Sequence, residues 1–145
     1  MSDKPRLVGV NHIVLEVGDI EHAMAFWHNI FEFDVRGAGD GFVFLDLGDQ
    51  FIGLVEGKSQ PADAHRHFGL VVDDRSRVMA LAAKAGAQIM DSDFMDFRDP
   101  WGNRIQVVEY RDLQFSKTPE VLRGMGLDLD KTEAAQEELR KKGKG

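Results

Sequence analysis

The stretch that decides the fold is DPWGNRIQVVE, residues 99–109. Its first half combines proline, glycine and asparagine, which favour tight turns because proline fixes φ and the other two accept positive φ. Its second half is rich in isoleucine and valine, which favour an extended strand. Gln106 is the one polar side chain inside that apolar run. The stretch therefore predicts a turn that leads into a strand carrying a single amide.

The chain repeats itself around this stretch. Residues 52–56, IGLVE, correspond to residues 105–109, IQVVE, and residues 11–19 correspond to residues 66–74. The two copies begin 55 residues apart, as the spacing of His12 and His67 shows. Each copy has the pattern of a strand, a helix and three further strands. The repeat therefore predicts two βαβββ modules.

Hydrophobic periodicity predicts the elements of both modules. In the first, we expect strands at residues 8–17, 33–36, 42–47 and 51–56, a glycine-rich turn at 37–41, and a helix capped by Asp19. In the second, we expect a helix capped by Asp74 and ending at Gly86, with strands at 88–90 and 94–98. His22 and His28 fall off the apolar stripe of the first helix, which predicts that both face solvent.

These elements predict an α+β fold with two paired βαβββ modules, at about residues 7–57 and 65–110, forming a cupped mixed sheet in a domain of residues 1–112. Residues 113–145 are expected to form a C-terminal helical extension. In it, Thr118 and Pro119 are typical of a helix start, and Asp130 with Glu133 forms a second capping pair. We interpret this extension as a strap over the domain or as a subunit contact, with a disordered end over the last ten residues as the alternative.

Composition limits the classes of function. The 145 residues carry a formal charge of −7, which argues against nucleic acid or an anionic membrane as the partner. There is no cysteine, so disulfides, thiolate metal sites and cysteine nucleophiles are excluded. No apolar run approaches the ~20 residues of a membrane span, and the first residues lack the apolar stretch of a signal peptide. We therefore expect a cytoplasmic protein that binds a small molecule.

Three side chains are candidates for chemistry. His12 and His67 occupy equivalent positions on the first strands of the two modules, and Gln106 lies on the last strand of the second. Imidazole is a common ligand of divalent transition metals, and two imidazoles with one oxygen donor leave positions open for a substrate. Gly53 is the counterpart of Gln106 in the first module and offers no side chain.

Several motifs in their order resemble one protein family. They are Asn11-His12-Ile13, residues 19–27, His67 and residues 99–105. Together they resemble the vicinal oxygen chelate superfamily, which contains glyoxalases, bleomycin-resistance proteins and extradiol dioxygenases, over about residues 7 to 110. The resemblance implies a divalent metal (Fe, Mn, Ni, Zn or Mg) held by first-strand and last-strand residues. Carried over, these ligands are His12, His67 and Gln106. The resemblance also implies a homodimer.

Two positions depart from the family pattern. Gln106 stands where the family usually has Glu, and Gly53 stands where glyoxalases have a fourth ligand. A neutral amide is a poorer donor than a carboxylate, so we expect weaker metal binding or an empty cup. The predicted function is a metal-dependent lyase, isomerase or dioxygenase-like enzyme; the alternative is a metal-free protein that sequesters a small molecule. Glu16, Phe51 and Phe97 are the predicted substrate contacts.

Overall fold

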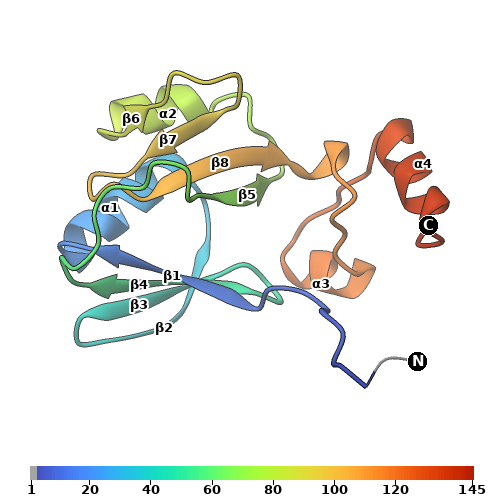
Figure 1. Ribbon diagram of the computed structural model, residues 1–145, viewed down its shortest axis with the longest axis horizontal. Helices are drawn as coiled ribbons and strands as arrows, with labels where there is room; N and C mark the ends of the chain where they lie inside the picture. The colour runs from blue at the N-terminus through green and yellow to red at the C-terminus, as the bar shows by residue number, and fades with distance from the viewer. Residues whose placement is uncertain (1–2) are drawn as a thin grey trace.

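Each repeat folds into one four-stranded sheet, and the two sheets have the same strand order (Figure 1). The first sheet runs β1 (His12–Val17), β4 (Phe51–Glu56), β3 (Phe42–Asp46) and β2 (Asp34–Gly39). The second runs β5 (Phe68–Val72), β8 (Arg104–Glu109), β7 (Asp96–Arg98) and β6 (Gln88–Ile89). In each sheet the first and last strands pair in parallel and the other pairs are antiparallel. This computed structural model describes residues 3–145, and it confirms the α+β fold of two βαβββ modules.

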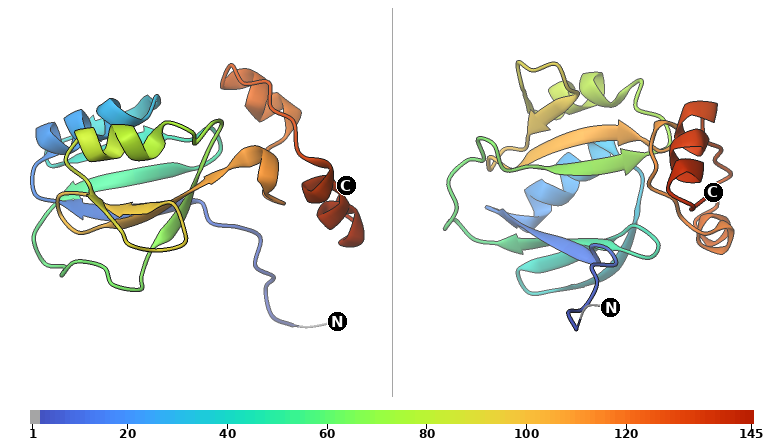
Figure 2. Two further views of the ribbon diagram at one scale, coloured as in Figure 1. Left: turned by 90° about the horizontal axis from the view of Figure 1, so that it is seen from above. Right: turned by 45° about the vertical axis from the view of Figure 1, so that its right-hand side comes forward.

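The two modules share one hydrophobic core. Helices α1 (Ile20–Ile30) and α2 (Val78–Lys84) contact each other and lie on the same side of the strands (Figure 2). Phe26 of α1 contacts Phe97 of β7, with ring centroids 6.2 Å apart. Strand β5 of the second sheet lies nearest to β1 of the first (Figure 1), although no strand pair joins the sheets within residues 3–145. Each sheet therefore has one face on the core and one helix-free face.

The turn at residues 99–103 joins the modules. The Asp99 carboxylate accepts hydrogen bonds from the backbone N–H groups of Trp101 and Asn103, at 2.9 and 2.8 Å. The Asn103 side chain donates to the carbonyl of Glu16 on β1, at 2.9 Å. The Trp101 ring lies against Gly18, where an added Cβ would be 2.4 Å from the indole nitrogen. Burial raises the pKa of Asp99, although hydrogen bonds from Asn103 and Trp101 oppose this shift.

Strand β1 is shorter than the sequence predicts. It begins at His12, opposite Phe51, the first residue of β4. Residues 8–11 lie before the first ladder pair, His12 with Phe51, and Val8 is 98% exposed. The apolar pattern made the predicted strand too long: Asn11 O still accepts from the Phe51 N–H, at 3.2 Å, but Val10 O accepts from the Gln50 side chain and not from a strand backbone.

The glycine-rich turn is also shorter than predicted. Strand β2 continues through Gly39, which pairs with Phe42 of β3, so only Asp40 and Gly41 form the turn. Gly41 has φ of +73°, a conformation that favours glycine.

Three of the predicted helix ends are confirmed, at Asp19, Gly86 and Thr118, and two are wrong. Asp19 caps α1 by accepting from the His22 N–H at 2.7 Å, and Gly86 follows α2 with φ of +98°. Asp74 does not cap α2, because its carboxylate accepts from Ser76 N–H in the preceding turn and the N-cap is Arg77. In the extension, Thr132 and not Asp130 caps the last helix.

The C-terminal extension is attached to both modules. It contains α3 (Pro119–Gly124), capped by Thr118, and α4 (Glu133–Lys141), and it follows a short 3-10 helix at Tyr110–Asp112. Residues Val121 and Met125 lie against Gly48 in the β3–β4 turn. Lys131 donates to the backbone carbonyls of Tyr110 and Leu113, at 2.9 and 2.7 Å. Across residues 3–145, none of the helices has the length and apolar character that a membrane span requires.

Candidate functional site

His12 lies at the start of β1, on the helix-free face of the first sheet. Its ring stacks on Phe51 of β4, with centroids 4.6 Å apart and planes 8° apart. Its Nδ1 lies 2.9 Å from the side-chain oxygen of Asn11. The tautomer that donates through Nδ1 leaves Nε2 free to bind a ligand.

Phe51 begins a row of rings across the same face. Phe44 of β3 lies 5.1 Å from Phe51, and Phe42 lies 5.2 Å from Phe44, centroid to centroid. The Arg36 guanidinium lies 4.3 Å above Phe51. We call His12, Phe51, Phe44 and Phe42 the aromatic row. It is half-buried to exposed and carries apolar surface on a face that no helix covers.

Gly53 lies within this face and supplies no ligand. A Cβ at Gly53 would lie 3.3 Å from Val14 and 3.5 Å from Phe44. A Cβ there would be in tight contact with Val14 and in ordinary van der Waals contact with Phe44.

His67 and Gln106 belong to the second sheet. His67 immediately precedes β5, and its Nδ1 lies 2.8 Å from the carbonyl oxygen of His65, which again leaves Nε2 free. Gln106 pairs with Gly69 of β5 and with Asp96 of β7. Its amide makes no hydrogen bond to residues 3–145, and a Cβ at Gly69 would meet nothing within 4 Å. The Gln106 amide therefore borders open space on the helix-free face of its sheet.

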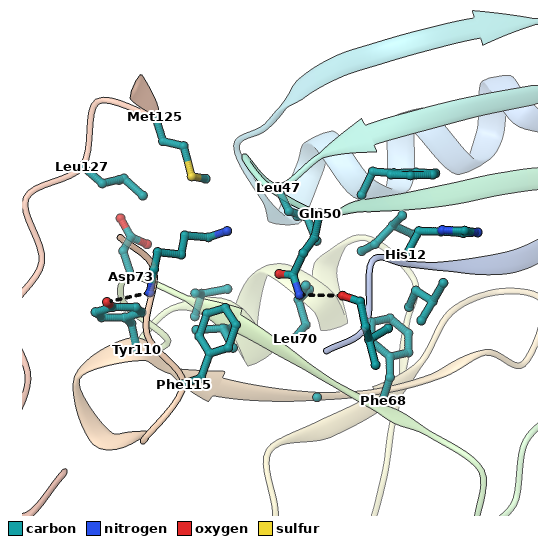
Figure 3. Close-up of a pocket in the computed structure, with 18 of the residues that line it drawn as sticks. His12, Leu47, Gln50, Phe68, Leu70, Asp73, Tyr110, Phe115, Met125 and Leu127 are labelled. Atoms are coloured by element: carbon teal, nitrogen blue, oxygen red, sulfur yellow. Dashed lines mark hydrogen bonds between the residues drawn. The ribbon is translucent and has the colours of Figure 1, made fainter. Parts of the chain in front are cut away.

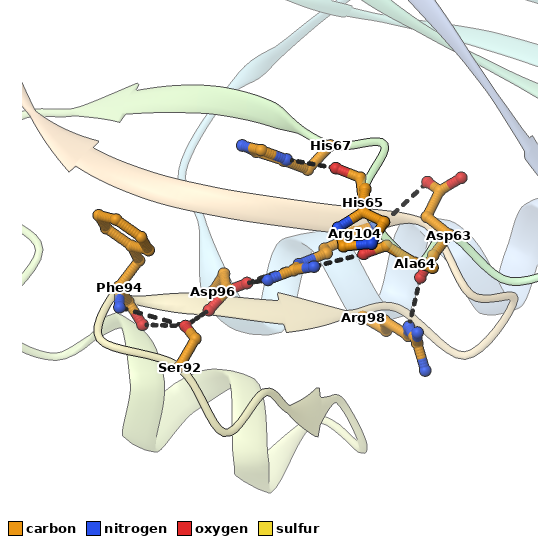
Figure 4. A network of polar contacts seen from close by, with 9 residues as sticks. All are labelled: Asp63, Ala64, His65, His67, Ser92, Phe94, Asp96, Arg98 and Arg104. Carbon is orange, nitrogen blue, oxygen red and sulfur yellow. Dashed lines mark hydrogen bonds and ion pairs between the residues drawn. The ribbon is translucent and has the colours of Figure 1, made fainter.

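A polar network holds the loop that precedes His67 (Figure 4). Arg104 of β8 forms an ion pair with the buried Asp96, at 2.6 Å, and also donates to the carbonyl of Ala64. Arg98 of β7 donates to the carbonyl of Asp63, at 2.8 Å. The second sheet thus anchors residues 63 and 64, three to four residues before His67. Sequence reasoning missed this network; the available signal was three charged residues at strand positions, Asp96, Arg98 and Arg104.

The three predicted ligands come from both sheets of the structure. His12 stands on the first sheet, whereas His67 and Gln106 stand on the second. Among the residues that the structure describes, no three His, Cys, Asp or Glu side chains form a group that could hold a metal. A cavity of about 480 Å³ is lined by His12 and Phe51, but by neither His67 nor Gln106 (Figure 3).

The predicted substrate contacts have different surroundings. Phe51 lies on the aromatic row and lines the cavity. Phe97 is 0% exposed and faces α1, so it is a core residue and not an accessible ligand contact. Glu16 accepts hydrogen bonds from the hydroxyl of Ser59 and the N–H of Gln60, at 2.6 and 3.0 Å, and from the N–H of Ser59. Its carboxylate therefore holds the connector between the modules.

The hydrogen bonds of Glu16 with Ser59 and Gln60 predict that the order of this connector depends on pH. The hydrogen bonds from Ser59, chiefly from its side chain, lower the pKa of Glu16 from 4.5 because they favour the carboxylate. Because the folded-state pKa is the lower one, the stabilisation is present above the unfolded-state pKa and is lost as pH falls through the folded-state pKa. Amide exchange followed by NMR should show Ser59 and Gln60 still protected at pH 4.5, with protection lost at lower pH. Glu16→Gln should remove this pH step; loss of protection already at pH 5 in the parent chain would contradict it.

Comparisons with known proteins identify the family. Residues 9–107 match the family described as Glyoxalase/Bleomycin resistance protein/Dioxygenase superfamily, and the chain belongs to it. The fosfomycin resistance protein FosX of Mesorhizobium loti is similar in structure, with TM-score 0.61 and 18% identity over 70% of this chain and 91% of that one. A variant of FosX from Listeria monocytogenes, complexed with Mn(II) and 1S,2S-dihydroxypropylphosphonic acid, has TM-score 0.62 and 17% identity over 83% and 99%.

An integron cassette protein of Vibrio cholerae has TM-score 0.56 and 25% identity over 74% of this chain and 98% of its own. Comparison with curated protein sequences gives no match. The family and its fold are therefore established for this chain, and the reaction is a matter for proposal.

Proposed function

We propose that the chain is a metal-dependent enzyme of this family, in which His12, His67 and Gln106 hold a divalent metal that acts on a small oxygenated substrate. The observation that carries the proposal is that the two imidazoles have the same hydrogen-bonding arrangement. Each presents Nδ1 to an oxygen acceptor, Asn11 Oδ1 at 2.9 Å or His65 O at 2.8 Å, and keeps Nε2 free. Metal-binding histidines are typically oriented in this way by a second hydrogen bond.

The third donor fits in chemical type. The amide oxygen of Gln106 is a neutral oxygen ligand, and its amide makes no competing hydrogen bond within residues 3–145. Two imidazoles and one amide oxygen suit a divalent transition metal and leave positions for substrate oxygens. Such a metal would supply Lewis-acid polarisation of those oxygens. The FosX variant that holds Mn(II) supports a divalent metal as the cofactor.

We further propose that the site is completed in a homodimer, by His12 of one copy with His67 and Gln106 of the other. The three residues are divided between two sheets that no strand pair connects within residues 3–145. Val10 and Val14 flank His12 in alternation and are 64% and 56% exposed. Apolar side chains exposed side by side on one face are typical of an interface.

The chain's own residues have separate tasks in this proposal. The network of Arg104 with Asp96 and Ala64 positions the loop before His67, and Phe51 orients His12 by stacking. No carboxylate stands at Gly53 or Gln106, so neither position can accept a proton from a substrate. A reaction at this site therefore has to proceed without a base at these two positions.

Metal binding tests the proposal. We expect stoichiometric metal in protein purified without chelator, and isothermal titration with Mn(II) should show saturable binding. His67→Ala should weaken that binding by roughly 10-fold to 100-fold or more, because it removes a ligand. His28→Ala is the matched control, since His28 is exposed on α1 and stacks only on Phe33. Equal affinities of the two variants, or a parent chain without metal, would reject the metal centre.

The aromatic row favours a second candidate, a metal-free protein that sequesters a planar ligand. Three phenyl rings and an imidazole in sequence form a stacking surface, and the net charge of −7 suits a cationic compound. In the presence of EDTA, a planar cationic dye should then raise the melting temperature of the parent chain. Phe44→Ala should remove that effect; no stabilisation by any such dye would exclude this candidate.

A further inference from the structure

A cavity of about 480 Å³ lies between the two sheets at the end nearest the C-terminal extension (Figure 3). Its volume falls in the range of small-molecule sites. The lining comes from both modules and the extension, and it is mainly apolar. The apolar members include Ile13, Leu47, Phe68, Leu70, Phe115 and Leu127.

The extension closes this cavity through specific contacts. We call residues 113–131 the C-terminal cap. Lys117 forms an ion pair with Asp49 in the β3–β4 turn, and Met125 lies against Gly48 in the same turn. At the other end of the cap, Lys131 binds the carbonyls of Tyr110 and Leu113. The cap is therefore held at two points, and it lies outside residues 9–107, which match the family.

The polar groups of the cavity indicate a ligand without net charge. The Lys117 ammonium is largely buried and already paired with Asp49. Asp73 also lines the cavity, but it is exposed to solvent. Burying a charged ligand group would be unfavourable here because the buried Lys117 charge is already paired and the Asp73 charge is exposed to solvent.

A second observation comes from Trp27 of α1. Its indole N–H is the single buried side-chain polar atom without a hydrogen-bond partner among residues 3–145. Trp27 lines a smaller cavity of about 70 Å³, which shares a wall with the larger one. The shared wall consists of Leu47, Ile52, Leu70, Val71 and Val72. A buried donor without a partner calls for an acceptor, supplied by water or by a ligand.

We propose that these cavities form a binding site for a neutral, largely apolar small molecule whose carbonyl or ether oxygen accepts a hydrogen bond from Trp27. The apolar body of the ligand occupies the space under the C-terminal cap, and its oxygen extends past the shared wall. The site needs no metal, because of the three proposed metal ligands only His12 lines it, and His67 and Gln106 do not. It adds a ligand class to the chain that does not depend on the proposed reaction.

Two probes that differ by one carbonyl group test the assignment. Naphthalene has no hydrogen-bond acceptor oxygen, whereas 2-acetonaphthone carries the same rings and a ketone. In equilibrium dialysis with EDTA, we expect both to bind the parent chain, and 2-acetonaphthone to bind about fivefold to tenfold more tightly. Trp27→Phe keeps an aromatic body but removes the N–H. This variant should still bind naphthalene and should lose the preference for the ketone.

Variants of the cap test the location. Leu127→Trp should fill the cavity and weaken the binding of both probes at least tenfold. Leu139→Trp on α4 is the matched control, because Leu139 lies outside the cavity and should leave both affinities unchanged. Phe44→Ala, on the aromatic row, should also leave them unchanged. Absence of naphthalene binding, or full binding by Leu127→Trp, would overturn the site; a ketone preference that survives in Trp27→Phe would overturn the role of Trp27.

Discussion

Replacing Phe97 with alanine should lower the free energy of unfolding by about 3–5 kcal/mol, the usual cost of removing a fully buried phenyl ring. Phe97 is 0% exposed, lies on β7 opposite Ile105 and contacts Phe26 of α1. Its ring thus connects the second sheet to the helix of the first module. Because small domains are stable by only about 5–15 kcal/mol, the variant should unfold at much lower urea concentration. Urea denaturation followed by circular dichroism measures the difference.

Phe94→Ala provides the matched control. Phe94 lies three residues earlier, before β7 begins, and is 64% exposed. Its removal should change the free energy of unfolding by less than about 0.5 kcal/mol, as for most surface substitutions. Similar losses in the two variants would contradict the assignment of Phe97 to the core, and with it the shared core of the modules.

Replacing Gln106 with glutamate should raise the affinity for Mn(II) roughly 10-fold to 100-fold. The two side chains have nearly the same shape, but glutamate brings a full negative charge to the position of the proposed oxygen donor. A carboxylate is a better ligand than a neutral amide for a hard divalent cation. The open space at Gly69, beside Gln106, should accommodate the change without strain. Isothermal titration of both proteins at pH 7 gives the ratio of affinities.

The control for charge alone is Gln88→Glu, at β6 on the far edge of the same sheet. It changes the net charge by the same amount and should leave Mn(II) affinity within about twofold. The gain in Mn(II) affinity from Gln106→Glu should also decrease at low pH. The added carboxyl group, with an ordinary pKa of about 4.3, binds metal only when it is ionised. An unchanged affinity in Gln106→Glu would show that this position is not a ligand.

Much of the fold was predictable because it depends on local patterns that occur twice. The apolar spacing of α1, the turn chemistry of residues 99–103 and the paired positions of His12 and His67 are all visible in the sequence. The start of β1 was not, because residues 8–11 have strand-like composition but lie before the first ladder pair, His12 with Phe51. The cap of α2 was not, because Asp74 accepts from Ser76 in a turn that begins before the helix.

The candidate site was predictable in residue type but not in surroundings. His12 was identified from its repeated position, and the ladder of β1 with β4 shows that it lies beside Phe51. Alternation did not settle Phe97, because β7 has only three residues and its phase comes from the ladder to β8. The sequence predicted Glu16 as a substrate contact. Only the folded connector shows that Ser59 and Gln60 donate hydrogen bonds to its carboxylate.

The sequence by itself determined that two equivalent modules exist, that each begins with a histidine, and that the turn at residues 99–103 leads into a strand bearing Gln106. These features depend on spacing and on backbone preferences, which act between neighbours in the chain. Only the tertiary structure decided that His12 belongs to one sheet while His67 and Gln106 belong to the other, and that the C-terminal cap closes a cavity between those sheets. Contacts such as Lys117 with Asp49 join segments distant in sequence, and no local pattern specifies them. The amide of Gln106 thus has a known place on its sheet, and metal titration will show whether it is a ligand.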